Sequence, residues 1–144
     1  MMDWIKVIVE KLYKKYNTRN PYKLAKLLNI HVIKMDLHEE INGFYQYEKR
    51  NRIIYINSNL SDEEQLIVCA HELGHAILHI RSNTPFMRKN TLFSISKIER
   101  EANRFAAELL IPDESFIGYN NIYVIASLHQ VPVELVKLKC EKLF

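Results

Sequence analysis

The sequence predicts an α+β fold in which a small antiparallel sheet of about three strands packs against one long helix and several others. Three observations lead to this prediction: helical periodicity over residues 2–28, β-rich alternation over residues 31–57, and strongly helical segments after that. Helices and strands that occupy separate parts of a chain are typical of α+β proteins. At 144 residues, the chain is expected to form a single domain, residues 1–144, that buries a core of its own.

Two helices are expected before the sheet. Residues 2–16 place apolar side chains at helical spacing, and the polar segment "NTRNP" ends that pattern. A shorter helix should begin at Pro21, because proline suits the first position of a helix, and should end at about Leu28.

The sheet is expected within residues 31–57. The segment "IHVIKMDL" is rich in residues that favour strands and predicts the first one. The segment "GFYQYEKRNRIIYIN" is typical of a hairpin, because apolar residues alternate on either side of the polar turn "EKRN". About three antiparallel strands should result.

The segment "SDEEQLIVCAHELGHAILHI" predicts the longest helix. Ser61 and Glu64 have the spacing of a capping box, and the acidic residues that follow Ser61 suit the positive end of the helix dipole. The rest of the chain is expected to hold an irregular stretch at 82–94 and helices at about 97–110, 119–128 and 132–142.

Composition excludes several classes of protein. The net charge of +3 is modest, and the basic side chains concentrated in residues 1–35 are expected to form solvated helix faces. Two cysteines, Cys69 and Cys140, do not make a disulfide framework, and Cys69 should be a buried free thiol. The chain has no signal-peptide pattern and no apolar run long enough for a membrane, so we expect a cytoplasmic protein.

The segment "HELGH", residues 71–75, carries the chemistry on which the functional prediction depends. Residues i and i+4 of a helix share a face, so His71 and His75 can present two imidazole nitrogens to one metal ion. Glu72 is rotated by roughly 100° from His71, the helical step per residue, and is better placed to contact a water beside the metal. The metal lowers the pKa of that water, and Glu72 is expected to be the general base when the water attacks a carbonyl group.

His79 extends the i, i+4 series but is not expected to bind the same ion. Each turn of a straight helix rises by about 5.4 Å, which is too far for one ion to contact all three histidines. The metzincin pattern requires glycine at position 78 and histidine at position 81, where this chain has Leu78 and Arg81. His79 should therefore lie behind the ligands or on the surface.

A third metal ligand should come from the later helix, "KIEREANRFAAELLIP". Glu99 borders the apolar face of this helix, whereas Glu101 lies with Arg104 and Glu108 on the opposite side. Because a ligand must point towards the core, Glu99 is the better candidate and Glu101 the alternative. Asn103 is placed to hydrogen-bond the free ring nitrogen of a ligating histidine. Two histidines and a carboxylate favour Zn²⁺, with Mn²⁺ as the second choice.

These residues resemble the ImmA/IrrE family of metallopeptidases. The resemblance rests on "HELGHAILH" followed by "EREANRFAAELLIP", and it extends from "PYKLAKLLNI" and the hairpin to "IASLHQVPVELVKLKCEKL". It implies a zincin-like α+β fold. It also implies His71 and His75 as metal ligands, Glu72 as catalytic base, and Glu99 or Glu101 as the third ligand.

The resemblance also implies a kind of partner. Family members include proteases of phages and integrative elements that cleave a repressor, as well as bacterial stress regulators. This short chain resembles the first type, so we expect site-specific, zinc-dependent cleavage of a helix-turn-helix repressor of a phage or mobile element. An extended substrate could pair with a sheet edge, with Tyr45, Tyr47 and Tyr55 as candidate contacts, although aromatic strand residues more often belong to the core.

The alternative is a non-catalytic regulator that binds DNA or protein with the same fold. The tail has two short helices and a tight turn, the outline of a helix-turn-helix. Its second helix offers Lys137 and Lys139 but also Glu134 and Glu141, and no arginine, so we expect a helical pair that packs on the core rather than direct nucleic-acid binding. Glu72 distinguishes the two functions, because hydrolysis needs this side chain and a scaffold does not.

Overall fold

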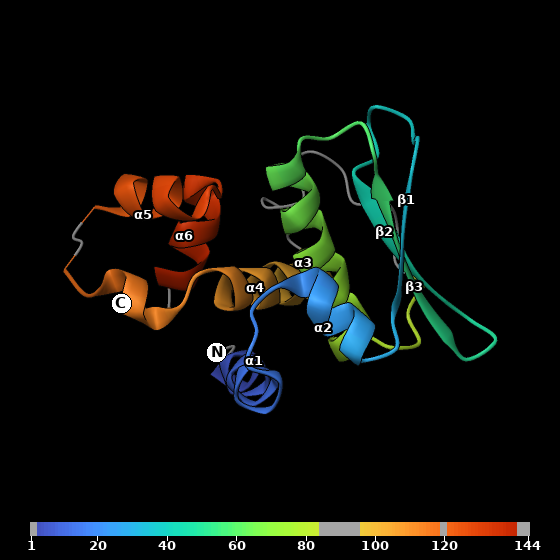
Figure 1. The fold of residues 1–144 in the computed structure, drawn as a ribbon, viewed down its shortest axis with the longest axis horizontal. Helices are drawn as coiled ribbons and strands as arrows, with labels where there is room; N and C mark the ends of the chain where they lie inside the picture. The colour runs from blue at the N-terminus through green and yellow to red at the C-terminus, as the bar shows by residue number, and fades with distance from the viewer. Residues whose placement is uncertain (1–2, 84–95, 119–120, 141–144) are drawn as a thin grey trace.

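The computed structural model describes residues 3–83, 96–118 and 121–140 (Figure 1). Its helices are α1 (Asp3–Tyr16), α2 (Pro21–Leu27), α3 (Asp62–Leu78), α4 (Lys97–Leu110), α5 (Ile122–His129) and α6 (Val133–Cys140), with a short 3-10 turn at Asp113–Phe116. Its strands are β1 (His31–Met35), β2 (Gly43–Glu48) and β3 (Asn51–Asn57). The expected helices and strands are confirmed within a few residues. The expected irregular stretch at 82–94 lies mostly outside the described residues.

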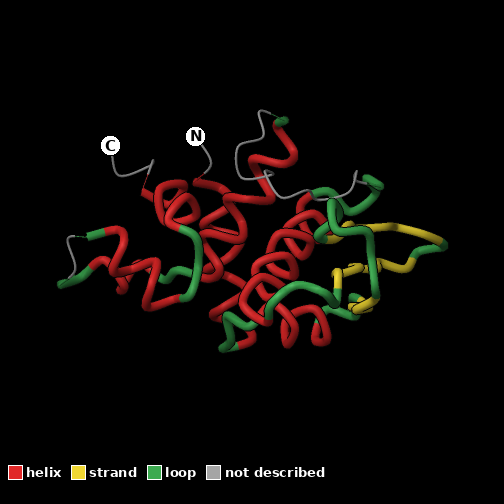
Figure 2. Tube along the Cα trace, turned by 90° about the horizontal axis from the view of Figure 1, so that it is seen from above, coloured by secondary structure: helices red, strands yellow, loops and turns green. Residues whose placement is uncertain are grey.

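The helices α3 and α4 form the centre of the molecule, with the sheet at one end and the α5–α6 pair at the other (Figure 1, Figure 2). α3 packs against α4 on one side and against β2 and β3 on another. α4 also contacts α1 and α6, while α2 lies against α3 and β1. This architecture confirms the predicted α+β class. No helix in the described ranges is long and apolar enough to cross a membrane.

The sheet is mixed, so the expectation of a wholly antiparallel sheet is wrong. The strand order is β1-β3-β2, with β2 antiparallel and β1 parallel to the central β3. β2 and β3 do form the predicted hairpin. Its two turn residues, Lys49 and Arg50, have φ values of 51° and 66°. Positive φ at both positions is typical of the type I′ turn, whose twist matches that of the paired strands.

The loop over residues 36–42 explains why β1 lies beside β3. This loop runs from the end of β1 across the end of β3 to the start of β2. Asn57, the last residue of β3, is buried, and its Nδ2 atom donates to the carbonyl oxygens of Leu37 at 3.3 Å and Ile41 at 2.8 Å. The strand order is therefore stabilised by a tertiary contact that hydrophobic alternation does not reveal.

The helix α3 begins with the predicted capping box. The Oγ atom of Ser61 accepts from the N–H of Glu64 at 3.2 Å, and the Glu64 carboxylate accepts from the N–H of Ser61 at 3.3 Å. The helix ends at Leu78, and the N–H of His79 donates to the carbonyl oxygen of His75 as the C-cap. His79 is therefore at the end of the helix, where its side chain can turn back over the last turn.

A glycine on α3 allows the close approach of α4. A Cβ atom at Gly74 would lie 3.1 Å from Cβ of Phe105 and 3.2 Å from Cα of Ala102. These distances are shorter than ordinary van der Waals contacts, so a larger residue would push the two helices apart. The absence of a side chain at Gly74 thus sets the separation between the residues that α3 and α4 present to each other.

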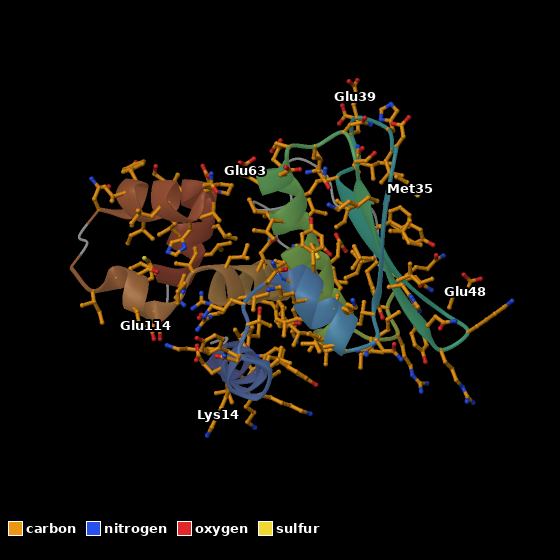
Figure 3. All side chains as sticks on the ribbon, in the orientation of Figure 1. Lys14, Met35, Glu39, Glu48, Glu63 and Glu114 are labelled. Atoms are coloured by element: carbon orange, nitrogen blue, oxygen red, sulfur yellow. The ribbon has the colours of Figure 1, made fainter. Side chains whose placement is uncertain are left out.

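α4 is buried on more sides than its pattern suggested. The side that carries Arg104 and Glu108 was expected to face away from the core, but both residues are buried. The reason is α6, whose Lys139 approaches the Glu108 carboxylate to 2.9 Å, while Arg104 binds the same carboxylate at 3.0 Å. Buried charges are tolerated when they are paired in this way. By contrast, Lys14, Glu48 and other charged side chains of the outer elements extend away from the body (Figure 3).

The tail forms the helical pair that was expected to pack on the core. Leu135 and Val136 are fully buried, and α6 lies against α4. Lys139 has only 3% of its side chain exposed, because it contacts Glu108 and Asp113. One of the two lysines that a helix-turn-helix would offer to DNA is therefore used inside the protein.

Candidate metal centre

The two histidines of the "HELGH" segment lie on the side of α3 that faces α4. Both have 1% of their surface exposed, and their rings meet edge to face with centroids 4.9 Å apart. From α4, the Glu99 carboxylate approaches both rings. Its Oε1 atom lies 3.0 Å from Nε2 of His71, and its Oε2 atom lies 2.8 Å from Nε2 of His75. The structure thus brings Glu99 to two histidines that lie more than twenty positions before it in the sequence.

Glu72 is the fourth member of this histidine–glutamate cluster, which we define as His71, Glu72, His75 and Glu99. Glu72 is 1% exposed, and its Oε2 atom lies 4.0 Å from Nε2 of His71. The potential ligand atoms of His71, Glu72 and His75 all lie within 4.8 Å of one another. Glu72 is close enough to reach a molecule held at the histidines, while Glu99 contacts both histidine nitrogens directly.

The imidazole nitrogens and carboxylate oxygens of the cluster fit the ligand set of a divalent metal ion. Three of its buried carboxylate oxygens, both of Glu72 and Oε2 of Glu99, have no aligned hydrogen-bond donor among the side chains that the structure describes. An unpaired buried carboxylate is costly, and a cation is one of the few partners that removes this cost. Two imidazole nitrogens and a carboxylate oxygen are the protein ligands of many catalytic zinc sites. The site therefore fits a divalent metal ion.

The electrostatics of the cluster are unusual even without a metal. Burial raises the pKa of Glu72 to about 8, with attraction to His71 opposing the shift and the charge of Glu99 adding to it. Burial lowers the pKa of His75 to about 4, against the effect of its contact with Glu99. For His71, burial is outweighed by the contacts with Glu99 and Glu72, and its pKa is raised. Shifts of this kind in one small cluster are typical of functional sites.

The pKa of Glu99 shifts in the opposite direction from that of Glu72. Burial would raise the pKa of its carboxyl group, but the contacts from His71 and His75 outweigh burial and lower it. Glu99 is thus held as a carboxylate between the two rings, as a metal ligand must be. The different surroundings of the two glutamates thus shift the pKa values of their carboxyl groups in opposite directions.

α4 also contacts the far side of the histidines. The Oδ1 atom of Asn103 lies 2.7 Å from Nδ1 of His71, which is the contact expected from the sequence. Glu101 does not reach the cluster directly. Its Oε1 atom lies 2.8 Å from Nε2 of His79, and Nδ1 of His79 lies 2.9 Å from Nδ1 of His75. The sequence placed His79 outside the ligand set, but it gave no signal for the pairing of His79 with Glu101.

The three tyrosines considered as substrate contacts have different positions. Tyr45 is 1% exposed, and its hydroxyl group donates to the carbonyl oxygen of Ile80, so this side chain belongs to the core. Tyr55 stacks on Phe44 with ring centroids 4.5 Å apart. The N–H of Tyr47 donates to the side chain of Asn83 at 2.9 Å, on the side of β2 that faces away from β3.

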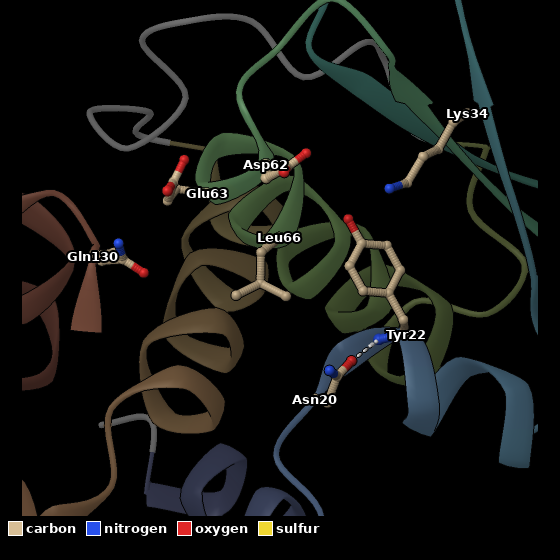
Figure 4. Close-up of a pocket in the computed structure, with 7 residues that line it drawn as sticks. All are labelled: Asn20, Tyr22, Lys34, Asp62, Glu63, Leu66 and Gln130. Carbon is tan, nitrogen blue, oxygen red and sulfur yellow. Dashed lines mark hydrogen bonds between the residues drawn. The ribbon is translucent and has the colours of Figure 1, made fainter.

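A separate cleft lies beside the first turn of α3, away from the cluster. Its volume is about 470 Å³, and Figure 4 shows the side chains that line it, from α2, β1 and α3 together with the turn between α5 and α6. Asp62 and Glu63 line this cleft together with Lys34, and none of the four residues of the cluster lines it. The mixed charges do not define a ligand.

The fold and the cluster together define a zincin-like α+β domain, in which one helix carries the HExxH segment and a neighbouring helix supplies a carboxylate. Comparison with known proteins agrees. The chain belongs to the peptidase M78 family: residues 25–141 match the family model described as the IrrE N-terminal-like domain. The predicted membership of the ImmA/IrrE family is therefore confirmed.

Two relatives illustrate this membership. The chain is 55% identical over 139 residues to "Uncharacterized immunity region protein 2" of Bacillus phage phi105, an alignment that covers 94% of this chain and 88% of the relative. It is 37% identical over 112 residues to "Metallopeptidase ImmA" of Bacillus subtilis (strain 168), covering 76% of this chain and 64% of the relative.

Proposed function

We propose that the protein is a metal-dependent endopeptidase. His71, His75 and Glu99 would hold the ion, zinc in preference to manganese, and Glu72 would be the general base. The observation that carries the proposal is the convergence of two histidine Nε2 atoms on one carboxylate, at 3.0 and 2.8 Å, beside a second buried carboxylate for which the described residues provide no hydrogen-bond donor. Membership of a peptidase family and similarity to a metallopeptidase support it.

The side chains of the cluster suit the steps of peptide hydrolysis. A bound zinc ion would supply a Lewis acid that lowers the pKa of water to about 7 and polarises the substrate carbonyl group. Glu72 accepts the proton of the attacking water, since its carboxyl group is buried beside His71 and receives no hydrogen bond from any residue in the described ranges. Burial raises the pKa of Glu72 to about 8, so this carboxylate is a stronger base than an exposed glutamate. The same group then passes the proton to the leaving amine.

We further propose that the substrate is a helix-turn-helix repressor encoded close to this protein in a phage or mobile element. Similarity to a protein named for a phage immunity region and to the metallopeptidase ImmA supports this substrate. The edge strand β2 packs on α3 and suits an extended substrate segment. Its outward backbone groups alternate along the strand, and that of Tyr47 already contacts Asn83; within the ranges that the structure describes, this leaves Tyr45 and Gly43 for a substrate.

The regulator that binds DNA through its tail is the weaker alternative. Lys139 is buried against Glu108 and Asp113, and of the two lysines of α6 only Lys137 is exposed. A recognition helix needs several free basic or polar side chains on one face. A regulator also has no use for the carboxylate of Glu72, which is buried and has no hydrogen-bond partner in the part of the chain that the structure describes.

Replacement of Glu72 by glutamine tests the catalytic part of the proposal. We expect Glu72→Gln to keep the zinc content and the melting temperature while cleavage of the neighbouring repressor slows by about 10²- to 10⁴-fold, the usual contribution of a general base. Cleavage is followed by electrophoresis and mass spectrometry of the repressor fragments. Glu63→Gln, at an exposed position of the same helix, is the matched control and should cleave normally. Wild-type cleavage by Glu72→Gln would show that the base is assigned wrongly.

Replacement of Glu99 tests the metal site. Freshly purified wild-type protein should contain about one zinc per chain by elemental analysis, whereas Glu99→Ala should retain much less, since one of three protein ligands is lost. Glu114→Ala changes an exposed carboxylate and is the matched control. Wild-type protein without stoichiometric metal would favour the regulator over the peptidase.

A further inference from the structure

We propose that Glu101 and His79 form a hydrogen-bonded relay that fixes the ring orientation and tautomer of His75, so that its Nε2 atom is free to bind the metal. The two residues are positioning residues, because each acts on the ion only through His75. The inference rests on the proposed metal site and assigns to His79 and Glu101 a role that neither the motif nor the ligand set includes.

The relay is continuous in the structure. The Nδ1 atom of His75 lies 2.9 Å from Nδ1 of His79, and Nε2 of His79 lies 2.8 Å from Oε1 of Glu101. The side chains of His79 and Glu101 are 8% and 10% exposed, so water does not readily replace either contact. Two ring nitrogens at this distance must share one proton, since two lone pairs or two N–H groups would repel each other.

The direction of each hydrogen bond follows from the Glu101 carboxylate, which is the last group of the relay. The Glu101 carboxylate only accepts, so His79 holds its proton on Nε2 and donates it there. In the neutral ring, Nδ1 of His79 is then an acceptor, and His75 donates to it from its own Nδ1 atom. The lone pair of His75 is consequently on Nε2, the atom that faces Glu99 at 2.8 Å. The relay thus leaves Nε2 of His75 without a proton and available to bind a metal.

His71 is held in a similar way by a shorter connection. Its Nδ1 atom contacts Oδ1 of Asn103 at 2.7 Å, which leaves Nε2 facing Glu99. Glu99, Glu101 and Asn103 all belong to α4, so this one helix contacts both ring nitrogens of His71 directly, whereas it contacts His75 directly only at Nε2. The contact to His75 needs His79 as a spacer because Glu101 points to a different side of α4 from Glu99.

The position of His79 makes this role feasible. His79 is the C-cap of α3, one turn beyond His75, with φ of −130° and ψ of 51°. A histidine four residues after a ligand stacks over it on the same helix face, and the two ring centroids are 5.1 Å apart. The same spacing that prevents His79 from sharing the ion with His71 lets it contact the rear of His75.

Zinc affinity of the full chain, measured by competition with a chromophoric chelator, tests the relay. His79→Phe keeps a flat ring but has no acceptor, and we expect it to weaken zinc binding by about 10- to 100-fold, the usual effect of losing such a partner. His79→Asn places an amide oxygen near the position of Nδ1 and should recover most of the affinity, as Asn103 serves His71. His31→Phe, at an exposed position of β1, is the matched control and should bind zinc normally.

A double-mutant cycle separates the relay from a direct electrostatic effect of Glu101. Glu101→Leu alone should weaken zinc binding, but it should add nothing in the His79→Phe background, because Glu101 acts through His79. Additive losses would mean that the Glu101 charge attracts the ion directly, and the relay would be rejected. Thermal unfolding of the metal-free variants identifies any loss of affinity that reflects misfolding.

Imidazole ¹H–¹⁵N spectra provide a readout that a merely structural role would not change. In the zinc-loaded wild type, His79 should carry its proton on Nε2 and His75 on Nδ1, whereas Glu101→Leu should leave His79 as a mixture of tautomers. A proton on Nδ1 of His79 in the wild type would overturn the relay. If the wild type binds no zinc, the proposed metal site itself fails and the relay with it. If it binds zinc and both His79→Phe and Glu101→Leu bind equally well, only the relay fails.

Discussion

The Nδ1 atom of His71, on α3, lies 2.7 Å from the Oδ1 atom of Asn103, on α4. An amide oxygen only accepts hydrogen bonds, so the neutral His71 ring must hold its proton on Nδ1. Its lone pair is then on Nε2, which faces Glu99 at 3.0 Å. This contact between the two central helices decides which ring nitrogen is offered to a metal.

Loss of the Asn103 acceptor should therefore weaken metal binding. We expect Asn103→Leu to lower zinc affinity by about 10- to 100-fold, because His71 loses the partner that orients its ring. Asn103→Asp keeps an oxygen at the same position and should recover most of the affinity. The measurement is chelator competition on both variants. Equal affinity of Asn103→Leu and wild type would mean that packing alone orients His71.

The close approach of the central helices at Gly74 should control both stability and the site. Gly74→Val would place methyl groups against Phe105 and Ala102, where even a Cβ atom lies only 3.1 and 3.2 Å from its neighbours. We expect a loss of about 1–3 kcal/mol in the free energy of unfolding, typical of overpacking, together with weaker zinc binding as Glu99 moves away from the histidines.

Chemical denaturation and chelator competition measure the two effects of Gly74→Val. Ser127→Val, on the exposed side of α5, is the control and should change the free energy of unfolding by less than about 0.5 kcal/mol. An unchanged zinc affinity in a destabilised Gly74→Val protein would show that the position of Glu99 does not depend on this helix contact.

The two thiols should differ in reactivity. Cys69 is fully buried, and burial raises the pKa of its thiol to about 12. Cys140 is only partly buried. Because the thiolate is the reactive form, a disulfide reagent should modify Cys140 in the folded protein and Cys69 only after unfolding. Absorbance of the released reagent counts the thiols in each state. Rapid reaction of two thiols in the native protein would contradict the buried position of Cys69.

The ion pairs of Asp113 should make stability depend on pH. Burial alone would raise the pKa of Asp113, but hydrogen bonds from Lys139 and Lys6 outweigh it and lower the pKa to about 2. An unfolded aspartate has a pKa of about 3.9, so Asp113 stabilises the fold above this pH and loses that contribution as the pH falls towards 2. Asp113→Asn should therefore be less stable than wild type at pH 7, and the difference should shrink between about pH 4 and pH 2.

Denaturant titrations at several pH values measure this difference. Its size should be at most about 1 kcal/mol, because the Asp113 side chain is 48% exposed and its ion pairs are screened by solvent. Glu48→Gln, an exposed position in β2, is the control. A difference that grows on acidification would contradict the assigned direction of the shift.

The features that depend on residues close together in the sequence were predictable from it. The capping box of Ser61 and Glu64 starts α3, the polar turn at Lys49 and Arg50 closes the hairpin, and helical spacing puts His71 and His75 on one face. Each of these features involves residues a few positions apart, for which backbone geometry alone decides what lies together. The class of fold followed from such local patterns, and the family followed from the resemblance carried by "HELGHAILH" and "EREANRFAAELLIP".

The remaining features depend on residues that are distant in the sequence. β1 pairs with β3 beside a loop that Asn57 binds, and Arg104 and Glu108 are buried because α6 covers them. Likewise, Glu101 reaches His79 only after α4 has packed on α3. A sequence pattern shows which side chains share a face of one element, but not which other element covers that face. Only the packing of α3, α4 and α6 decides which element covers a given face. The same packing decides which polar residues contact the Nδ1 atoms of the two histidines.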